Sequence, residues 1–247
     1  MIAVALVLSL LIGLSLGLLG GGGSTLTLPI LSYVAGMATK PAIASSLFVV
    51  AVTSATGVIA HARAGRVRWR TGVVFGLAGM TGAFVGGRLA GYLPGRALML
   101  MFAAMLVMAG IAMLRGRRAG AATTVQDLPL AKVIPSGVVI GLVAGIVGAG
   151  GGFLVVPALV LLGGLPIEVA VGTSLVVISM QSFAGFFGHL GHVSVDWPLT
   201  LAVTGAAVVG SFVGGALGGK VPAVVLRRAF GVLVLVMAAV VLAKELL

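Results

Sequence analysis

Residues 145–157 read Gly145-Ile146-Val147-Gly148-Ala149-Gly150-Gly151-Gly152-Phe153-Leu154-Val155-Val156-Pro157. They lie inside a run, residues 133–167, that contains no charged side chain. A straight helix of that length would extend over about 50 Å, whereas a bilayer core measures roughly 30 Å. Consecutive glycines interrupt a helix and leave backbone amides free. The sequence therefore predicts two helical pieces joined at a glycine break.

The same pattern, Gly-x-x-Gly-x-Gly-Gly leading to a proline, also occurs at residues 17–29, in the charge-free run 1–39. A shift of 128 residues aligns 12–102 with 140–230 without a gap. About 31 of the 91 aligned positions are identical, where this composition would give roughly 10 by chance. The chain is thus a duplicated unit.

The duplication sets the expected organisation. We predict a first membrane repeat at 1–114, a cytoplasmic linker at 115–132 and a second membrane repeat at 133–247. Each repeat should hold a glycine-broken helix or hairpin followed by three transmembrane helices. The predicted fold class is therefore an all-α polytopic membrane protein with two homologous repeats.

Composition excludes most other classes of protein. Of the 247 residues, 60% are hydrophobic and 8% are charged, whereas soluble domains carry about 25% charged residues. The absence of Cys excludes a disulfide scaffold. The net charge of +11 comes from basic clusters between apolar runs, as in membrane proteins, and does not indicate nucleic acid as a partner. We expect a multi-pass protein of a bacterial-type inner membrane.

The basic residues also bear on the orientation of the repeats, because cytoplasmic loops are enriched in Lys and Arg. If each broken run crosses the membrane once, the repeats are parallel and the 15 basic residues divide nine inside and six outside. If each broken run is a hairpin, the repeats are inverted and the division is eleven against four. The charges favour inverted repeats, with 63–70, 115–132 and 220–228 in the cytoplasm.

Inverted repeats with broken helices are typical of secondary transporters, whose substrate sites lie near the midplane where the repeats meet. Irregular backbone at that depth is tolerated only where it is buried in protein or lines a wet cavity. The two glycine breaks are the predicted place for such a cavity.

The ordered motifs resemble the sulfite exporter TauE/SafE family of anion permeases. The resemblance rests on residues 145–157, on a helix opening with Gly172-Thr173-Ser174-Leu175, and on a turn from Gly188-His189-Leu190-Gly191 to Val195-Asp196-Trp197. The first half matches through residues 17–29, Ser45-Ser46-Leu47 and the stretch from His61 to Trp69, but it has Ser24-Thr25 in place of Gly152-Phe153 and Arg68 in place of Asp196. The resemblance implies a permease for sulfite, sulfonates or other small organic anions, without fixing the anion.

The candidate substrate site combines the glycine breaks with small polar residues that follow them. Helix N-termini with free amides can bind an anion without a cation. The alternative is that the glycines serve only close helix packing and that the hydroxyls bond back to their own helices. Gln181 aligns with Thr53 in the repeat. Its side-chain amide must find a hydrogen-bond partner inside the membrane, either the substrate or another helix. The predicted site residues are Gly22, Gly23, Ser24, Thr25, Ser46, Gly150, Gly151, Gly152, Ser174 and Gln181.

His61 and His189 occupy matching places at the ends of their helices, where they serve either as interfacial caps or as a proton relay. The four acidic residues all lie at run ends or in the linker, which argues against a cation pump or a metal transporter. We expect no cofactor, no metal site and no catalysis. The expected partners are a small anion and the lipid bilayer, and a homo-oligomer is compatible with the sequence.

Three functions remain open at this stage. The first is a permease for a small anion, such as a sulfur oxyanion or organosulfonate, that works by alternating access. The second is a facilitative, channel-like pore for a small metabolite on the same architecture. The third is a membrane scaffold that transports nothing. A scaffold would have no reason to repeat the glycine breaks symmetrically. The direction of transport and the coupling ion are not readable from the residues.

Overall fold

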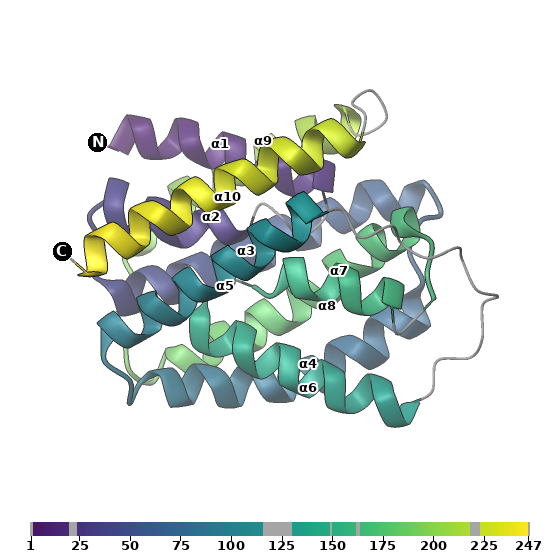
Figure 1. The fold of residues 1–247 in the computed structure, drawn as a ribbon, viewed down its shortest axis with the longest axis horizontal. Helices are drawn as coiled ribbons and strands as arrows, with labels where there is room; N and C mark the ends of the chain where they lie inside the picture. Colours follow the sequence, from purple (N-terminus) through teal and green to yellow (C-terminus); the bar gives the residue numbers. More distant parts are fainter. Residues whose placement is uncertain are drawn as a thin grey trace.

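The computed structural model describes residues 2–19, 24–115, 130–148, 150–161, 164–217 and 223–246, and within these ranges it is helical with no strand (Figure 1). The predicted all-α class is therefore confirmed. Gly22, Gly23 and most of the linker 115–132 lie outside the described residues. The elements are α1 Ile2–Leu19, α2 Ser24–Pro29, the π-helical turn η1 Ile30–Val34, α3 Thr39–Arg63, α4 Trp69–Ala90, α5 Gly95–Arg115, α6 Leu130–Val147, α7 Gly152–Leu161, α8 Ile167–His189, α9 Trp197–Leu217 and α10 Ala223–Leu246.

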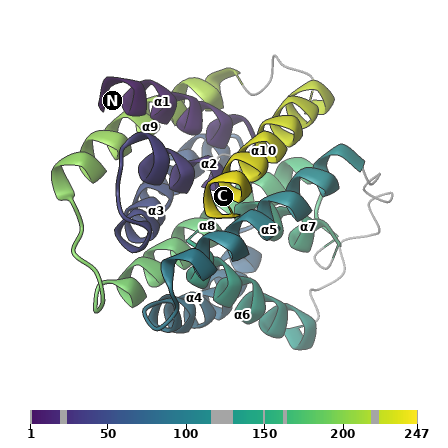
Figure 2. The same cartoon turned by 60° about the vertical axis from the view of Figure 1, so that its left-hand side comes forward.

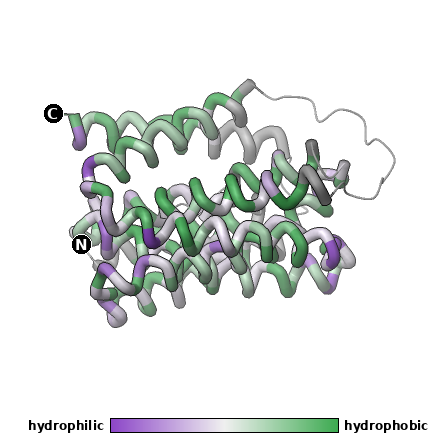
Figure 3. The backbone as a smooth tube through the Cα atoms, turned by 90° about the horizontal axis from the view of Figure 1, so that it is seen from below, coloured by the Kyte–Doolittle hydropathy of each residue, from purple (hydrophilic) through white to green (hydrophobic). Residues whose placement is uncertain are grey.

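Four of these helices are long and apolar enough to cross a membrane. They comprise Thr39–Arg63, Trp69–Ala90, Glu168–His189 and Trp197–Gly214. Hydrophilic residues gather at the two ends of the bundle and the middle is apolar (Figure 3). Large apolar side chains such as Phe84 and Phe212, which occupy matching places in the repeat, are exposed. Such a surface suits contact with lipid chains rather than with water.

Helices of one half pack against helices of the other half. Figure 2 shows α1 beside α9 and α4 beside α6. A methyl group placed on Gly82 of α4 would collide with the Val138 carbonyl oxygen of α6. The pair related by the 128-residue shift, Gly210 of α9 and Leu10 of α1, makes the same close contact. The contact of α4 with α6 is therefore equivalent to the contact of α9 with α1, and each joins one half to the other.

The central pair, α3 and α8, runs antiparallel. A methyl group on Gly57 would lie 3.4 Å from Leu175, and one on Gly185 would lie 3.3 Å from Leu47, which are again matching pairs. Between these contacts Ser179 Oγ donates to the Ala51 carbonyl oxygen at 3.0 Å, and these two positions are themselves 128 residues apart. The bundle consequently has a pseudo-two-fold relation centred on this crossing.

The two ends of the bundle can be named from this pair. The Arg63 end holds the end of α3, the loop 64–68 and the start of α8. The His189 end holds the start of α3, the end of α8 and the loop 190–196. Both chain termini lie together at one end of the bundle in Figure 1. There Tyr33 Oη donates to Glu245 Oε1 at 3.1 Å and joins η1 to α10.

Candidate functional site

The second glycine break is a tight reversal of the chain. Gly148, Gly150 and Gly151 have φ of +76°, +63° and +66°, a left-handed conformation that residues other than glycine rarely adopt. A methyl group on Gly151 would lie 2.9 Å from Ala144 Cβ and 3.8 Å from Ile140 Cγ2. Residues eleven apart in a continuous helix would be separated by about 16 Å. In this half the broken run is therefore a hairpin of α6 and the shorter α7.

The turn is wedged between the two central helices. A methyl group on Gly150 would lie 2.6 Å from Val50 Cγ1 of α3 and 3.0 Å from Ser182 Oγ of α8. Ser46 Oγ lies 2.8 Å from the Gly148 carbonyl oxygen, so the hydroxyl of one half holds the glycine turn of the other. The predicted residues Ser46, Gly150 and Gly151 are thus brought together across the two halves.

Two buried polar side chains face this turn. Gln181 and Ser182 are at most 1% exposed, and neither the Gln181 amide nor the Ser182 hydroxyl has a hydrogen-bond partner among the described residues. Gln181 Oε1 is 3.4 Å from a methyl group placed on Gly151. On its other side, a methyl group on Gly79 of α4 would overlap the Gln181 amide nitrogen. Glycines on two elements therefore make room for this amide.

The turn carries hydrogen-bond donors and no fixed charge. The N-terminus of α7, at Gly152, has amide groups that receive no partner from their own helix, together with the positive end of its dipole. Gln181 and Ser182 add an amide and a hydroxyl. No group of three or more His, Cys, Asp or Glu side chains that could hold a metal ion occurs within the described ranges. This set of groups offers donors to a small anion and contains no carboxylate that would attract a cation.

The matching residues of the first half differ. Thr53, in the place of Gln181, donates to the Val49 carbonyl oxygen of its own helix at 2.6 Å. Ser174 of the second half, which matches Ser46, donates to the Val171 carbonyl oxygen at 2.7 Å, as Ser46 does to the matching Ile43 carbonyl oxygen. Ser24 and Thr25 are buried at the start of α2, next to Gly22 and Gly23, whose structure is not described. The second-half turn is consequently the one whose surroundings can be described.

The two predicted histidines differ in their contacts. His189 Nε2 lies 2.9 Å from the Gly145 carbonyl oxygen in the last turns of α6, so this histidine joins the end of α8 to the helix that leads into the glycine break of its own half. The Nδ1 atom of the matching His61 is buried and has no hydrogen-bond partner among the described residues.

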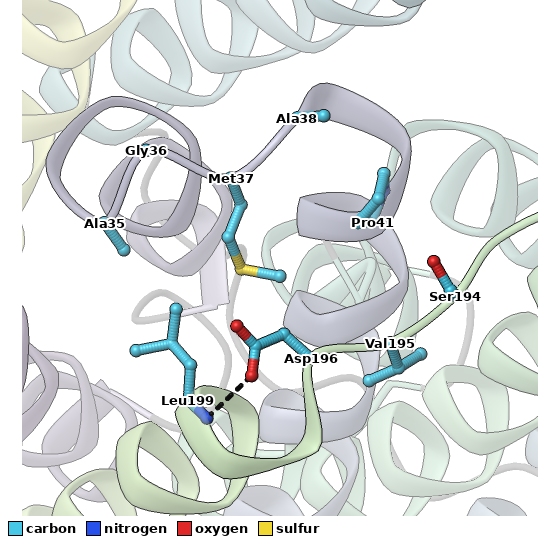
Figure 4. A pocket seen from close by; sticks show the side chains of 9 residues that line it. All are labelled: Ala35, Gly36, Met37, Ala38, Pro41, Ser194, Val195, Asp196 and Leu199. Atoms are coloured by element: carbon cyan, nitrogen blue, oxygen red, sulfur yellow. Dashed lines mark hydrogen bonds between the residues drawn. The ribbon is translucent and has the colours of Figure 1, made fainter.

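A pocket of about 380 Å³ opens at the His189 end between residues 35–41 and 194–199 (Figure 4). Met37 points toward the segment that holds Asp196. The Asp196 carboxylate accepts from the Leu199 backbone N–H at 3.1 Å and so caps the start of α9. Its charge is thereby directed to the helix N-terminus.

The corresponding contact at the Arg63 end is tight. The Arg68 backbone N–H donates to Thr173 Oγ1 at 3.0 Å. A methyl group on Gly172 would collide with the Arg66 carbonyl oxygen, whereas the residue that matches Gly172 at the other end is Ala44. The loop 64–68 therefore packs closely against the start of α8. At the other end it is Thr200 of α9 that contacts the start of α3, where its Oγ1 donates to Ser45 Oγ at 2.9 Å.

Comparison with known proteins follows this geometry. The sequence pattern of the sulfite exporter TauE/SafE family matches residues 5–241. The chain belongs to the sulfite exporter TauE/SafE family. The resemblance predicted from the motifs is confirmed, and the protein is an integral membrane protein of a transporter family.

Curated relatives carry names of the same kind. A "probable membrane transporter protein" of Xylella fastidiosa (strain Temecula1) is 36% identical over 236 residues, which cover 92% of this chain and 90% of the relative. The "probable membrane transporter protein YdhB" of Bacillus subtilis (strain 168) is 27% identical and covers 89% of this chain and 91% of its own. No solved structure matches the chain.

Sequence reasoning missed four buried hydroxyls that have no partner among the described residues: Thr27, Ser54, Ser182 and Ser211. One signal was available for two of them, since Ser54 and Ser182 are identical residues in the 128-residue alignment. Thr27 aligns with Val155, and Ser211 aligns with Ala83. The alignment therefore gives no such indication for these two residues.

Proposed function

We propose that this protein carries a small anion, such as sulfite or a small sulfonate, across a bacterial-type inner membrane by alternating access. The observation that carries the proposal is the glycine turn formed by Gly148, Gly150 and Gly151, which faces the buried Gln181 and Ser182, and these two side chains have no hydrogen-bond partner among the described residues. Buried polar groups without partners cost stability, so a protein retains them where a ligand supplies the partner. The proposal includes no catalytic step.

The donors around the turn favour an anion of modest affinity. A helix N-terminus contributes about 0.3–2 kcal/mol, and each hydrogen bond to a charged group contributes about 1.5–3 kcal/mol. Together with the cost of desolvating the anion, these terms are compatible with about 4–8 kcal/mol, which corresponds to millimolar to micromolar dissociation constants. A site of this kind should accept several compact oxyanions and exclude amines.

Alternating access is supported by the relation between the halves. The antiparallel contact of α3 with α8 is the arrangement that two repeats of opposite orientation would make in a membrane. The basic loop 63–70 then faces the cytoplasm, as the charge distribution predicts. The pocket at the His189 end and the seal at the Arg63 end fit a carrier that is closed toward the cytoplasm and accessible from outside.

Transport by the purified protein in proteoliposomes tests the proposal. We expect saturable uptake of labelled sulfite, competition by small sulfonates, and no competition by amines. Unlabelled anion inside the vesicles should accelerate uptake of labelled anion, because a carrier exchanges substrate faster than it returns empty. Uptake that neither saturates nor responds to internal anion would favour the facilitative pore instead.

A matched pair of glycine variants connects transport with the turn. Gly150→Leu places a side chain against Val50 and Ser182 and should abolish uptake while the protein remains in the membrane. Gly205→Leu is the control, because a methyl group on Gly205 meets nothing within 4 Å. Equal uptake by the two variants would show that the glycine turn serves only close helix packing.

A further inference from the structure

Ser54 and Ser182 are an unusual pair among the buried hydroxyls. Both are 0% exposed, and neither hydroxyl has a partner among the described residues. A hydroxyl in a helix has a carbonyl oxygen of the preceding turn within reach. Several other hydroxyls here use that carbonyl, among them Ser46, Thr53, Thr56, Ser174 and Thr204. Among the hydroxyls of the described residues that do not, Ser54 and Ser182 occupy the same position of the repeat.

The position of each serine follows from the central crossing. Ser179 meets Ala51 at the centre, and Ser182 and Ser54 each lie three residues further along their own helices. Because α3 and α8 are antiparallel, Ser54 is displaced toward the Arg63 end and Ser182 toward the His189 end. At 1.5 Å per residue, the two positions are separated by about 9 Å along the bundle.

The surroundings of Ser182 are the glycine turn already described. Ser54 lies in a second polar region within the apolar core. Gly57 lies one turn further along the same face of α3, and a methyl group on it would lie 3.4 Å from Ser211 Oγ of α9. Ser211 is 2% exposed, and its hydroxyl has no partner among the described residues. Thr27, on α2 beside α3, is also buried, and its hydroxyl has no partner among the described residues.

We propose that the chain holds its anion at two successive positions, one with Gln181 and Ser182 and a second with Ser54 and Ser211. This proposal rests on the proposed function, since it names a second position on the same path. An anion without hydrogen bonds is strongly disfavoured in the low-dielectric interior. A membrane core of roughly 30 Å leaves a long distance on either side of a single site. A second set of hydroxyls about 9 Å away shortens the interval in which the anion lacks partners.

Uptake kinetics and thermal unfolding of Ser54→Ala and Ser182→Ala test the two positions. Each single variant weakens one position and leaves the other intact, so the KM for sulfite should rise only about twofold, whereas the double variant should raise it roughly tenfold, as expected for the loss of one hydrogen bond to a charged group at each position. The Tm without substrate should stay the same or rise, because each change removes a buried hydroxyl that has no partner among the described residues. Thr204→Val is the control, because Thr204 Oγ1 donates within its own helix at 2.7 Å, and its KM should match the wild type.

The outcomes separate this proposal from the proposed function. A wild-type protein that takes up no anion would overturn both. Wild-type uptake in which the KM of the double variant equals that of Ser182→Ala would overturn only the second position, and so would a lower Tm of Ser54→Ala with unchanged kinetics, which indicates a structural hydroxyl. If Ser54→Ala fails to fold, Ser211→Ala tests the same position, and a KM that it leaves unchanged in the Ser182→Ala background would have the same meaning.

Discussion

Ser46 of α3 and Gly148 of the glycine turn are joined across the two halves of the molecule, with 2.8 Å between the serine Oγ and the glycine carbonyl oxygen. Ser46 Oγ is also 2.8 Å from the Ile43 carbonyl oxygen of its own helix, so its single hydrogen is shared between two acceptors. In our proposal Ser46 therefore positions the turn, whereas Gln181, Ser182 and the amides at the start of α7 hold the anion.

The first prediction concerns this contact. Ser46→Ala leaves the buried Gly148 carbonyl oxygen without its partner and should lower the free energy of unfolding by about 1–3 kcal/mol. Thermal unfolding of the purified protein measures the change. Thr56→Val, which removes a hydroxyl bonded only within α3, is the matched control and should cost less. Equal stability of Ser46→Ala and the wild type would mean that this bond does not hold the turn.

The second prediction concerns Gln181. Gln181→Leu removes an amide that has no partner among the described residues, so stability should be unchanged or higher while sulfite uptake falls at least tenfold. Uptake and Tm measured on the same preparation check both parts. A large loss of stability would instead assign Gln181 to interhelical hydrogen bonding.

The third prediction uses the difference between the halves around this residue. Gly79→Ala should lower stability, because the new methyl group would overlap the Gln181 amide. Adding Gln181→Thr should restore stability, since the matching pair of positions combines Ala207 of the second half with Thr53 of the first half. A double-mutant cycle on the free energy of unfolding measures this coupling. Additive effects would show that Gly79 and Gln181 are independent.

The fourth prediction concerns the seal at the Arg63 end. Gly172→Ala pushes against the Arg66 carbonyl oxygen and should loosen the loop 64–68. A cysteine introduced at Thr71 in this naturally Cys-free chain should then react several-fold faster with a water-soluble maleimide. Gly205→Ala in the same background is the control. Unchanged reactivity would exclude Gly172 as a determinant of which end is closed.

The amino-acid sequence predicted the helical class, the family and the position of the glycine break because these depend on local pattern. A charge-free run too long for one crossing must break, and glycines at matching places indicate where. The sequence left open whether the second broken run crosses once or returns. The contact of Gly151 with Ala144 and Ile140 resolves this for the second half, because only folded structure brings those residues together.

The roles of individual hydroxyls could not be read from the residues. Ser46, Ser54 and Ser182 look alike in sequence, yet one reaches a carbonyl oxygen 102 residues away and two have no partner among the described residues. Which case applies depends on the element that packs against each serine. Ser211 is less predictable still, since only the packing of α9 against α3 brings it to Gly57.

The central claim is that a small anion binds at the glycine turn of the second half. A structure determined with selenite, a close analogue of sulfite whose selenium scatters anomalously, tests it most directly. The account predicts anomalous density beside Gly150 and Gly152, within hydrogen-bonding distance of Gln181 and Ser182. Bound selenite elsewhere in the protein, with this place empty at a selenite concentration that inhibits sulfite uptake, would contradict it.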